Sequence, residues 1–336
     1  MSLAHAAPVL PAAAPSALGA EVLRGLTATP KTLSPWLFYD ARGSELFEKI
    51  TTLPEYYLTR TERAIFREHA SEILATAAGD RRLALIELGA GTATKTGLLL
   101  KAALERQQSV TYCALDVSPS ALEEARTTIT SQFPGVTVET RVADYTENLS
   151  AIQPLKNSAT RRLVLYIGSS IGNFDPADAT GLLRRLRQRL APGDHILLGA
   201  DHAPGTGKDT ATLLRAYDDA SSVTAAFNRN ALVRINRELD ANFDLHAFRH
   251  IARWNPQHSR MEMHLESTRR QTVSVAALGL NLNFSPGETI HTENSYKFTP
   301  GSIAHLLADG GFTVTHSWTD ARRWFGVYLA SASPLQ

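Results

Sequence analysis

Short hydrophobic runs alternate with helix-forming stretches over the first 200 residues of the chain. The runs are LALIEL (83–88), TYCALD (111–116), VTVETRV (136–142), LVLYIG (163–168) and HILLGA (195–200). The stretch between the last two runs has leucines at helical spacing and begins with Asp175, a capping residue, and Pro176, which suits a first turn. Buried runs that alternate with helices predict a doubly wound, mostly parallel sheet.

A helix is also expected ahead of the first run, at 60–77. Thr59 and Glu62 have the spacing of a capping box, in which each side chain bonds to the backbone of the other residue. Hydrophobic residues then recur on one face of the stretch. The pattern therefore predicts an amphipathic helix that is capped by Thr59.

The pattern changes after about residue 200. APGTGKD (203–209) is typical of a flexible loop, and residues 210–240 have helical periodicity. Three later stretches alternate like antiparallel strands, namely HAFRHIARW, RMEMHLES and QTVSVAALGLNLNF. We therefore expect a second, α+β unit that is inserted into the first.

The tail of the chain returns to the first pattern. A helix is expected near 299–309, followed by the runs FTVTHSW (312–318) and FGVYLAS (325–331). Runs this close in the sequence suit a hairpin at the end of the sheet. A mostly parallel, Rossmann-like sheet with a terminal antiparallel hairpin is similar to the plan of class I methyltransferases.

Composition excludes several classes of protein. The 336 residues are 43% hydrophobic and 20% charged, which is typical of a folded protein. A net charge of +1 without a long basic run argues against nucleic acid or an anionic membrane as a partner. No hydrophobic run approaches the ~20 residues that a membrane helix needs.

The start of the chain and its cysteine content bear on location. The first residues are rich in Ala and Pro and lack the basic segment of a signal peptide, so we expect a loose arm at 1–20. Cys113 is the only cysteine, so no internal disulfide can form, which suits the reducing cytoplasm. Because Cys113 lies in a hydrophobic run, we expect it to be inert.

The sequence IELGAGTATKT follows the first run and opens a helix. Gly89 and Gly91 allow a sharp turn and a close approach of the backbone to a ligand. Thr94 stands where a dinucleotide-binding fingerprint would have its third glycine. The stretch therefore predicts a nucleoside site but disfavours a dinucleotide.

Carboxylates end the next two runs. Asp116 can accept hydrogen bonds from both ribose hydroxyls, and Asp144 can accept one from an adenine amino group against which Tyr145 stacks. Each of these residues alone could equally cap a helix or form a turn. Together they lie at the carboxyl ends of successive strands, where such sheets bind ligands. They favour S-adenosylmethionine, whereas a dehydrogenase that binds NAD would share only the first two sites.

Candidate substrate residues are scattered. Asn173 lies in YIGSSIGNFDP, in which Gly168 and Gly172 allow close approach and the amide offers both a donor and an acceptor. Tyr217 lies in the inserted unit, and the segment 36–62 is rich in tyrosine. A turn asparagine and aromatic residues that staple a helix to the core are the structural alternatives.

The stretch IHTENSYKFTP (290–300) suggests the end of a strand, a polar elbow and a helix start. Glu293 and Ser295 alternate on an extended chain, so their side chains point the same way. A carboxylate acceptor and a hydroxyl donor could bind a ring that carries a donor and an acceptor, as imidazole does. On these residues alone a solvated turn is the preferred interpretation.

The chain resembles the histidine Nα-methyltransferases of the ergothioneine pathway. The resemblance covers nearly all of the chain after the arm, in FYDARGSELFEKIT, LPEYYLTRTE, ELGAGTATKT, GSSIGN, RAYDDASSVTAAFNRN, NRELDANFDLHAF and TENSYKF. It implies S-adenosylmethionine as the methyl donor and histidine as the acceptor, methylated three times to hercynine. It also implies a substrate-binding domain at 21–60 and 201–286, and a methyltransferase core at 61–200 and 287–336.

The resemblance assigns roles to individual residues. Tyr56, Asn173 and Tyr217 would hold the amino and carboxylate groups of the amino acid and so act as the catalytic set. Tyr39, Glu293 and Ser295 would face the imidazole, with Met263 beside the substrate. The cofactor positions would be Gly89, Gly91, Lys95, Asp116, Asp144 and Tyr145. The chain departs from the family in a longer loop at 202–212 and in a polar Asn294.

Alternatives within and outside this family remain open. A related methyltransferase could act on an indole amino acid, although Glu293 and Ser295 favour imidazole. A methyltransferase-like protein could bind the nucleoside without turnover, although Tyr56, Asn173 and Tyr217 are all present. His246 and His250 have the spacing of a helical metal pair but no clear third ligand, so we expect no metal. We also expect a cytoplasmic monomer.

Overall fold

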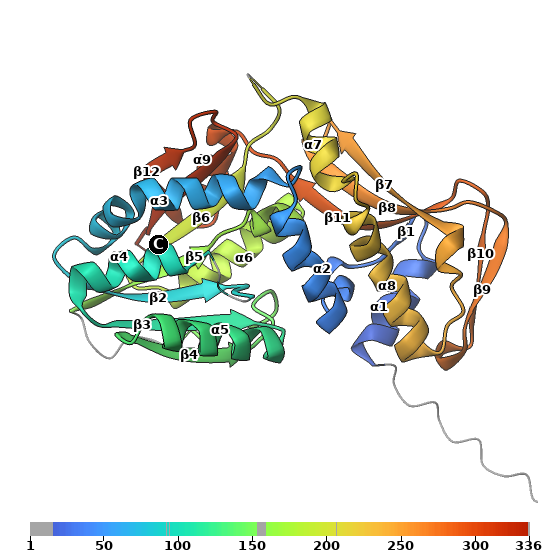
Figure 1. The fold of residues 1–336 in the computed structure, drawn as a ribbon, viewed down its shortest axis with the longest axis horizontal. Helices are drawn as coiled ribbons and strands as arrows, with labels where there is room; N and C mark the ends of the chain where they lie inside the picture. The colour runs from blue at the N-terminus through green and yellow to red at the C-terminus, as the bar shows by residue number, and fades with distance from the viewer. Residues whose placement is uncertain (1–15, 92, 94, 153–158, 206, 335–336) are drawn as a thin grey trace, which may run out of the picture.

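The computed structural model describes residues 16–334 except 92, 94, 153–158 and 206. Figure 1 shows a larger α/β lobe on the left and a smaller lobe on the right, with the C-terminus in the larger one. The predicted arm lies outside the described residues up to residue 15. Residues 17–20 already belong to helix α1 (Ala17–Thr27), because the Ser16 side chain accepts a hydrogen bond from the Gly19 N–H and caps that helix.

The larger lobe is built on a seven-stranded sheet in the order β12-β13-β6-β5-β2-β3-β4. In chain order these strands are β2 (Arg82–Leu88), β3 (Val110–Asp116), β4 (Val136–Val142), β5 (Thr160–Tyr166), β6 (His195–Asp201), β12 (Phe312–Thr319) and β13 (Phe325–Ala332). The first five pair in parallel, whereas β13 runs antiparallel to both β6 and β12. The predicted class I methyltransferase plan, including its terminal hairpin, is confirmed.

Helices cover both faces of this sheet. They are α3 (Tyr57–Ala78), α4 (Gly97–Gln107) and α5 (Pro119–Gln132) on one face, and α6 (Pro176–Arg189) and α9 (Pro300–Asp309) on the other. Alternate residues of β2 feed the two cores: Leu83 and Leu85 pack with α3 and α4, and Ile86 and Leu88 pack with α6. Burial on both faces explains why the strands read as continuous hydrophobic runs.

The smaller lobe contains a four-stranded sheet in the order β1-β11-β8-β7 and a two-stranded ribbon of β9 and β10. Its strands are β1 (Lys31–Thr32), β7 (Phe248–Asn255), β8 (Arg260–Ser267), β9 (Gln271–Val275), β10 (Leu280–Phe284) and β11 (Thr289–Tyr296). Its helices are α1, α2 (Ala41–Thr52), α7 (Thr210–Tyr217) and α8 (Val223–Leu239). The antiparallel strands and helices predicted after residue 200 are therefore present.

One predicted boundary differs from the structure. Strand β11 belongs to the smaller sheet, where it pairs with β8 and β1, although a boundary at residue 287 would place it in the core. The strand also extends to Tyr296, so the expected polar elbow at 290–300 is extended backbone. Its ladder to β8 satisfies the backbone groups that an elbow would leave to water.

At three places, partners that are distant in the sequence replace the local contacts that the sequence suggested. Helix α3 begins at Tyr57, so Thr59 and Glu62 lie inside it and form no capping box. Asp175 does hold the N-cap position of α6, but its carboxylate accepts from the Tyr296 hydroxyl and not from the helix. In the expected flexible loop, Lys208 is buried and pairs with Asp201 at 2.7 Å.

Candidate active site

A single cavity of about 950 Å³ brings the predicted site residues together. It extends from the carboxyl ends of β2, β3, β4 and β5 to the inner face of β11 and to α2 and α7. All thirteen residues proposed from the sequence line it: Tyr39, Tyr56, Gly89, Gly91, Lys95, Asp116, Asp144, Tyr145, Asn173, Tyr217, Met263, Glu293 and Ser295. Their individual roles stay predictions, but they share one space.

The loop after β2 needs both of its glycines. Gly89 and Gly91 have φ angles of +67° and +53°, in the left-handed region that favours glycine. A Cβ atom on Gly89 would also lie 3.2 Å from the Tyr145 hydroxyl oxygen. The backbone therefore turns sharply here and lies close to the ring predicted to stack on a base.

The two strand-end carboxylates, Asp116 and Asp144, both line the cavity and keep bonding capacity. The oxygens of Asp116 accept from the N–H groups of Gly91 and Ser118, each at 2.9 Å. One oxygen of Asp144 accepts from the backbone and hydroxyl of Thr146. A carboxylate has about four lone-pair sites, so each of them can still accept from a ligand hydroxyl or amino group.

Lys95 is held by a residue that the sequence pattern placed elsewhere. Its Nζ lies 3.0 Å from Glu62 Oε2, and the other oxygen of Glu62 accepts from the Gly168 N–H at 2.8 Å. Gly168 has a φ of +81°, in the left-handed region that favours glycine. Glu62 is fully buried and joins the loops after β2 and β5. Its only signal in the sequence was its place on the hydrophobic face of α3.

Glu87 contacts residues on both sides of the glycine loop that follows β2. It lies near the end of β2 and accepts from the Thr96 hydroxyl at 2.6 Å and the Tyr112 hydroxyl at 2.5 Å. Burial raises the pKa of Glu87 to about 7, against the effect of these two donors. The contacts tie the glycine loop to α4 and β3.

A cluster of aromatic rings lines part of the cavity. Tyr56 packs edge-on against Tyr217 with ring centroids 6.2 Å apart, and Tyr39 packs edge-on against Phe47 and Phe227. Burial, followed by the charge of Glu293, raises the pKa of Tyr39, and Asp116 adds to the shift. The pKa of Tyr39 is therefore raised by a carboxylate of the smaller lobe, Glu293, and by one of the larger lobe, Asp116.

Three substrate candidates carry neutral polar groups. Burial raises the pKa of Tyr56 and that of Tyr217 well above the usual value, so both phenols stay protonated. Asn173 ends the short 3₁₀ helix Ser170–Asn173, and its amide makes no hydrogen bond to another described residue. Its donor and acceptor are thus free to meet a ligand.

A β-bulge sets the direction of Glu293. The register between β11 and β8 shifts between His291 and Glu293, and Glu293 then pairs with Met263. Bulges redirect side chains in this way. No described residue donates a hydrogen bond to the Glu293 carboxylate, and burial raises its pKa to about 8 although Lys297 opposes the shift. Glu293 is an acceptor that lacks a donor.

Lys297 is the main residue that sequence reasoning missed. Its buried Nζ lies 2.9 Å from Asp201 Oδ2, 2.6 Å from the Tyr217 hydroxyl and 2.9 Å from the Ser295 hydroxyl. The two hydroxyls are 2.8 Å apart. A lysine in TENSYKF reads as a surface residue, and only the pairing with Asp201 across two lobes makes its burial tolerable.

The two histidines with metal-like spacing do not form a pair. His246 is exposed, whereas His250 is buried and bonds to Asn228 and to the backbone carbonyl of Tyr217. His250 thereby supports the end of α7. Over the described ranges, no group of three or more His, Cys, Asp or Glu side chains is placed to hold a metal ion.

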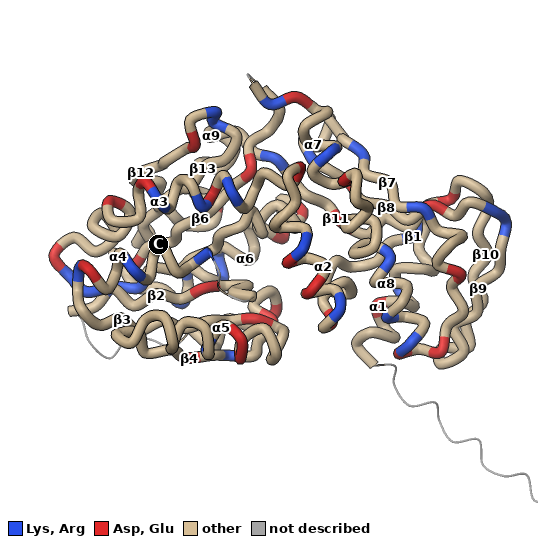
Figure 2. Tube along the Cα trace, in the orientation of Figure 1, with Lys and Arg blue, Asp and Glu red and all other residues tan. Residues whose placement is uncertain are grey.

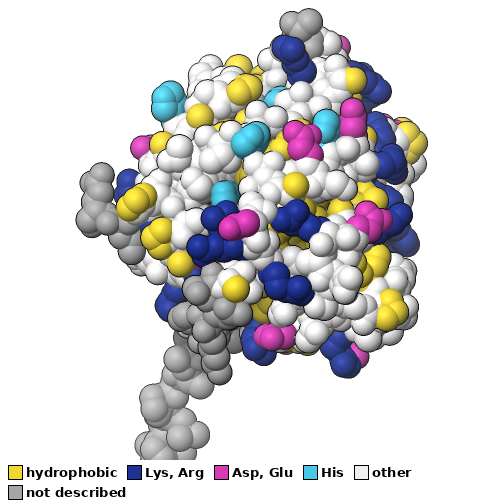
Figure 3. Space-filling model, turned by 90° about the vertical axis from the view of Figure 1, so that its left-hand side faces the viewer, with side chains coloured by type: hydrophobic (Ala, Val, Ile, Leu, Met, Phe, Trp, Pro, Cys, Tyr) yellow, Lys and Arg dark blue, Asp and Glu magenta, His cyan; other side chains and the backbone are white. Residues whose placement is uncertain are grey.

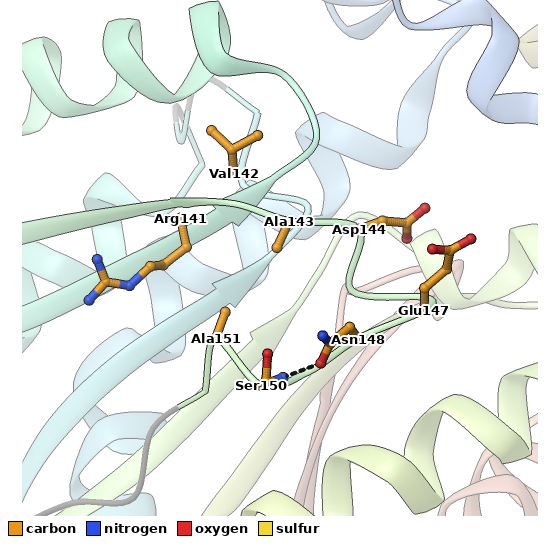
Figure 4. Close-up of a pocket in the computed structure, with 8 residues that line it drawn as sticks. All are labelled: Arg141, Val142, Ala143, Asp144, Glu147, Asn148, Ser150 and Ala151. Atoms are coloured by element: carbon orange, nitrogen blue, oxygen red, sulfur yellow. Dashed lines mark hydrogen bonds between the residues drawn. The ribbon is translucent and has the colours of Figure 1, made fainter. Parts of the chain in front are cut away.

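Outside the cavity, the described part of the chain has a second hollow and a surface of mixed charge. A second, shallower hollow of about 530 Å³ follows β4, and Figure 4 shows the carboxylates of Asp144 and Glu147 on one side of it, with Arg141 directed away. Acidic and basic residues are interspersed along the described trace (Figure 2), and both kinds lie among scattered hydrophobic side chains on the face in Figure 3. Among the described helices, none is long and apolar enough to cross a membrane.

Comparison with known proteins gives a consistent result. Residues 18–332 match the family described as "Histidine-specific methyltransferase, SAM-dependent". The histidine N-alpha-methyltransferase of Mycolicibacterium smegmatis is 46% identical over 94% of this chain and 95% of its own length, and that of Mycobacterium tuberculosis is 43% identical over 94% and 95%. The ergothioneine biosynthesis protein 1 of Neurospora crassa is 29% identical over 91% of this chain, which spans 34% of that longer protein.

The match covers both lobes, because it begins in α1 and ends in β13. The cavity between the lobes therefore lies entirely within the matched region. This chain belongs to the family of S-adenosylmethionine-dependent, histidine-specific methyltransferases.

Proposed function

We propose that the protein transfers methyl groups from S-adenosylmethionine to the α-amino nitrogen of L-histidine, three times in succession, to give hercynine. The observation that carries this proposal is that one cavity is lined both by the residues expected to bind a nucleoside, called here the nucleoside half, and by those expected to bind an amino acid, called the amino-acid half. The names of the bacterial relatives support the substrate, and that of the fungal relative supports ergothioneine biosynthesis as the pathway.

The nucleoside half fits the methyl donor. Asp116 would accept from the ribose hydroxyls, Asp144 from the adenine amino group, and the backbone at Gly89 and Gly91 permits close approach. A volume of about 950 Å³ lies at the upper end for small-molecule sites, which suits a cavity for two ligands. When bound, S-adenosylmethionine supplies an electrophilic methyl group on sulfur.

The amino-acid half positions the nucleophile. The nucleophile is the neutral amine, whose pKa of about 8 makes deprotonation inexpensive near neutral pH. A carboxylate beside the amine would favour the unreactive ammonium form. The hydroxyls of Tyr56 and Tyr217 and the amide of Asn173 are neutral partners, so they orient the amine without that effect. Catalysis then rests on positioning, and no dedicated general base is required.

Repeated transfer needs a site that accepts a growing cation. Each methylation removes an N–H donor until a quaternary ammonium remains. Tyrosine faces attract such cations, and the rings of Tyr39, Tyr56 and Tyr217 all line the cavity. The same rings can therefore hold the amine at the start and the trimethylated product at the end.

Glu293 and Ser295 favour histidine over an indole amino acid. They lie two residues apart on β11, and both line the amino-acid half. Imidazole offers one N–H and one bare nitrogen, whereas indole offers only an N–H and a larger ring. Further parts of the proposal are that the protein is a monomer in the cytoplasm, and that it uses no metal and binds no nucleic acid or membrane.

The decisive experiment is an incubation of the purified protein with methyl-labelled S-adenosylmethionine and a mixture of the twenty amino acids, read by mass spectrometry. We expect label in mono-, di- and trimethylated histidine and in no other amino acid. Label in tryptophan alone would support the indole alternative. Binding of S-adenosylhomocysteine without label in any amino acid would support a non-catalytic protein.

A further inference from the structure

Lys297 makes three hydrogen bonds, which matches the capacity of an ammonium group. Its side chain is fully buried, and its Nζ contacts Asp201 Oδ2, the Tyr217 hydroxyl and the Ser295 hydroxyl at 2.6–2.9 Å. An ammonium group has three N–H donors and no acceptor. Every proton of Lys297 is therefore assigned, and both hydroxyls must accept from it.

Asp201 keeps this ammonium charged. Burial lowers the pKa of Lys297, and the carboxylate at 2.9 Å opposes that shift. Burial would raise the pKa of Asp201, but Lys297 and Lys208 outweigh burial and lower it. Asp201 also accepts from the Tyr57 hydroxyl at 2.9 Å. The carboxylate thus has partners on both oxygens and remains ionised.

The donors and acceptors of the Tyr217 and Ser295 hydroxyls can be counted. Each has one proton and two lone pairs, and Lys297 fills one lone pair on each. Because the oxygens of Tyr217 and Ser295 are 2.8 Å apart, one of them donates to the other. Whichever donates, the pair keeps one proton and one lone pair, and no other described residue uses either.

We propose that Lys297 is a positioning residue that fixes the hydrogen-bond directions of Ser295 and Tyr217 and so selects a ring with a bare nitrogen. The inference rests on the proposed function, in which both hydroxyls contact histidine. A ring N–H that binds Glu293 favours the ionised carboxylate, which can only accept, so in the complex Glu293 takes the ring N–H. The bare ring nitrogen then needs a donor, and Ser295 on the same strand supplies its proton.

That choice sets the role of Tyr217 as well. If Ser295 donates to the ring, Tyr217 must donate to Ser295, and its remaining lone pair can accept only from the amino group of the substrate. An acceptor at an amine N–H leaves the nitrogen lone pair free for methyl transfer. Lys297 therefore couples recognition of the ring to orientation of the nucleophile, although it need not touch the substrate.

Loss of the ammonium would remove this constraint. In Lys297→Met each hydroxyl regains a lone pair and Asp201 Oδ2 loses a donor, so the Tyr217 proton can turn to Asp201 while Ser295 donates to Tyr217. A substrate without the bare nitrogen would then no longer leave a buried donor unpaired. Asp201 would still pair with Lys208 at 2.7 Å, so the variant buries no uncompensated charge and is expected to fold.

The test compares histidine with 3-(pyrrol-2-yl)alanine and 3-(pyrrol-3-yl)alanine, which each keep one ring N–H and lack the other nitrogen. The readout is the ratio of kcat/KM for histidine to that for each analogue. An unpaired buried donor costs about 1–3 kcal/mol, so Lys297→Met should lower the wild-type ratio by about tenfold or more. The KM for S-adenosylmethionine should change by less than about twofold.

Lys208→Met is the matched control. It removes the other buried ammonium from the same carboxylate, but Lys208 contacts Tyr57, Asp201 and the carbonyl of Trp324 and neither cavity hydroxyl. We expect its ratio to stay within about twofold of the wild-type value. A ratio that falls equally in Lys208→Met and Lys297→Met would show a merely structural effect and overturn the proposal. So would a wild-type ratio in a folded Lys297→Met variant.

Tyr217→Phe tests the same assignment without altering a charge. It frees a lone pair on Ser295, but Lys297 still occupies Asp201 Oδ2, so the Ser295 proton has no acceptor other than the ring. The ratio should therefore persist while kcat/KM falls for every substrate. A collapse of the ratio in Tyr217→Phe would contradict the assignment, even if Lys297→Met fails to fold. Absence of any methyl transfer to histidine by the wild type would instead overturn the proposed function.

Discussion

The two halves of the cavity are assembled in different ways. The nucleoside half uses residues at the ends of β2, β3 and β4, which are neighbours in one parallel sheet. The amino-acid half draws on α2, the turn after β5, α7, β8 and β11, which come from both lobes. The first half is thus a product of sheet topology, whereas the second exists only where the lobes meet.

The halves also treat buried charge differently. Glu87 and Asp116 in the nucleoside half accept hydrogen bonds from neighbouring side chains or backbone. Glu293 in the amino-acid half accepts none from the described residues, and its pKa is raised to about 8. In the proposed cofactor half these carboxylates already have protein donors, whereas in the proposed amino-acid half Glu293 is left for a donor on the substrate.

The largest effect should follow from removing that unsatisfied group. A site built to bond polar ring atoms rejects analogues that lack them by up to roughly 10⁴–10⁵-fold. Glu293→Ala should sharply reduce turnover of histidine and open space, so that activity on tryptophan rises relative to it. The measurement is a competition assay with both amino acids in one tube. A wild-type histidine-to-tryptophan ratio in the variant would show that Glu293 does not contact the ring.

The next effect concerns the neutral partners of the amine. Tyr56→Phe and Asn173→Ala should each lower turnover by about 10²-fold, because small misplacement of a nucleophile has that cost. Their affinity for S-adenosylhomocysteine, measured by calorimetry, should stay near the wild-type value. If a variant lost as much affinity for S-adenosylhomocysteine as activity, its residue would belong to the nucleoside half. That result would contradict the division of the cavity into two halves.

The contrast between the halves explains what the sequence could predict. Gly89, Asp116 and Asp144 could be located because a hydrophobic run ends just before each of them, and the ends of parallel strands meet. Glu293 and Ser295 could be paired by alternation, but only the resemblance to a family favoured a site over a turn. The terminal hairpin was also predictable, since its two runs are close in the sequence.

The burial of charged residues could not be predicted from local sequence patterns. Glu62 matched a capping box, yet its carboxylate lies between Lys95 and the Gly168 N–H, more than thirty residues from either. Lys208 and Lys297 lie in stretches that were expected to be a flexible loop and a solvated turn, yet both pair with Asp201. A lysine or glutamate is almost never fully buried unless it is paired, and its partner is invisible until the chain is folded.

A smaller and purely local effect is expected in the nucleoside half. Asp116→Ala should weaken binding of S-adenosylhomocysteine by at least about 10- to 100-fold, which is the effect of losing one charged hydrogen bond to the ribose. The histidine-to-tryptophan ratio should not change, in contrast to Glu293→Ala. Calorimetry on the wild type should also show no tight binding of NAD. Tight NAD binding without any for S-adenosylhomocysteine would reverse the assignment of this half.

The smallest effect is a pH dependence of stability that should arise in the amino-acid half. The pKa of Glu293 is about 8 in the folded protein and about 4.3 in an unfolded chain. A raised pKa means that the unfolded state releases its proton first. The stability associated with the protonated carboxyl is therefore fully present below about pH 4.3 and is lost as the pH rises through about 8.

Glu293→Gln should isolate this contribution, because glutamine resembles the protonated acid at every pH. In the absence of ligands, the variant should melt at a higher temperature than the wild type, by a margin that is small near pH 5 and grows steadily up to about pH 8. Histidine should reverse the order at the higher pH, since it supplies the N–H that only the ionised wild-type carboxylate binds fully. A difference in melting temperature that does not vary with pH would mean that Glu293 carries a partner in the free protein. The contrast between a satisfied and an unsatisfied half would then be lost.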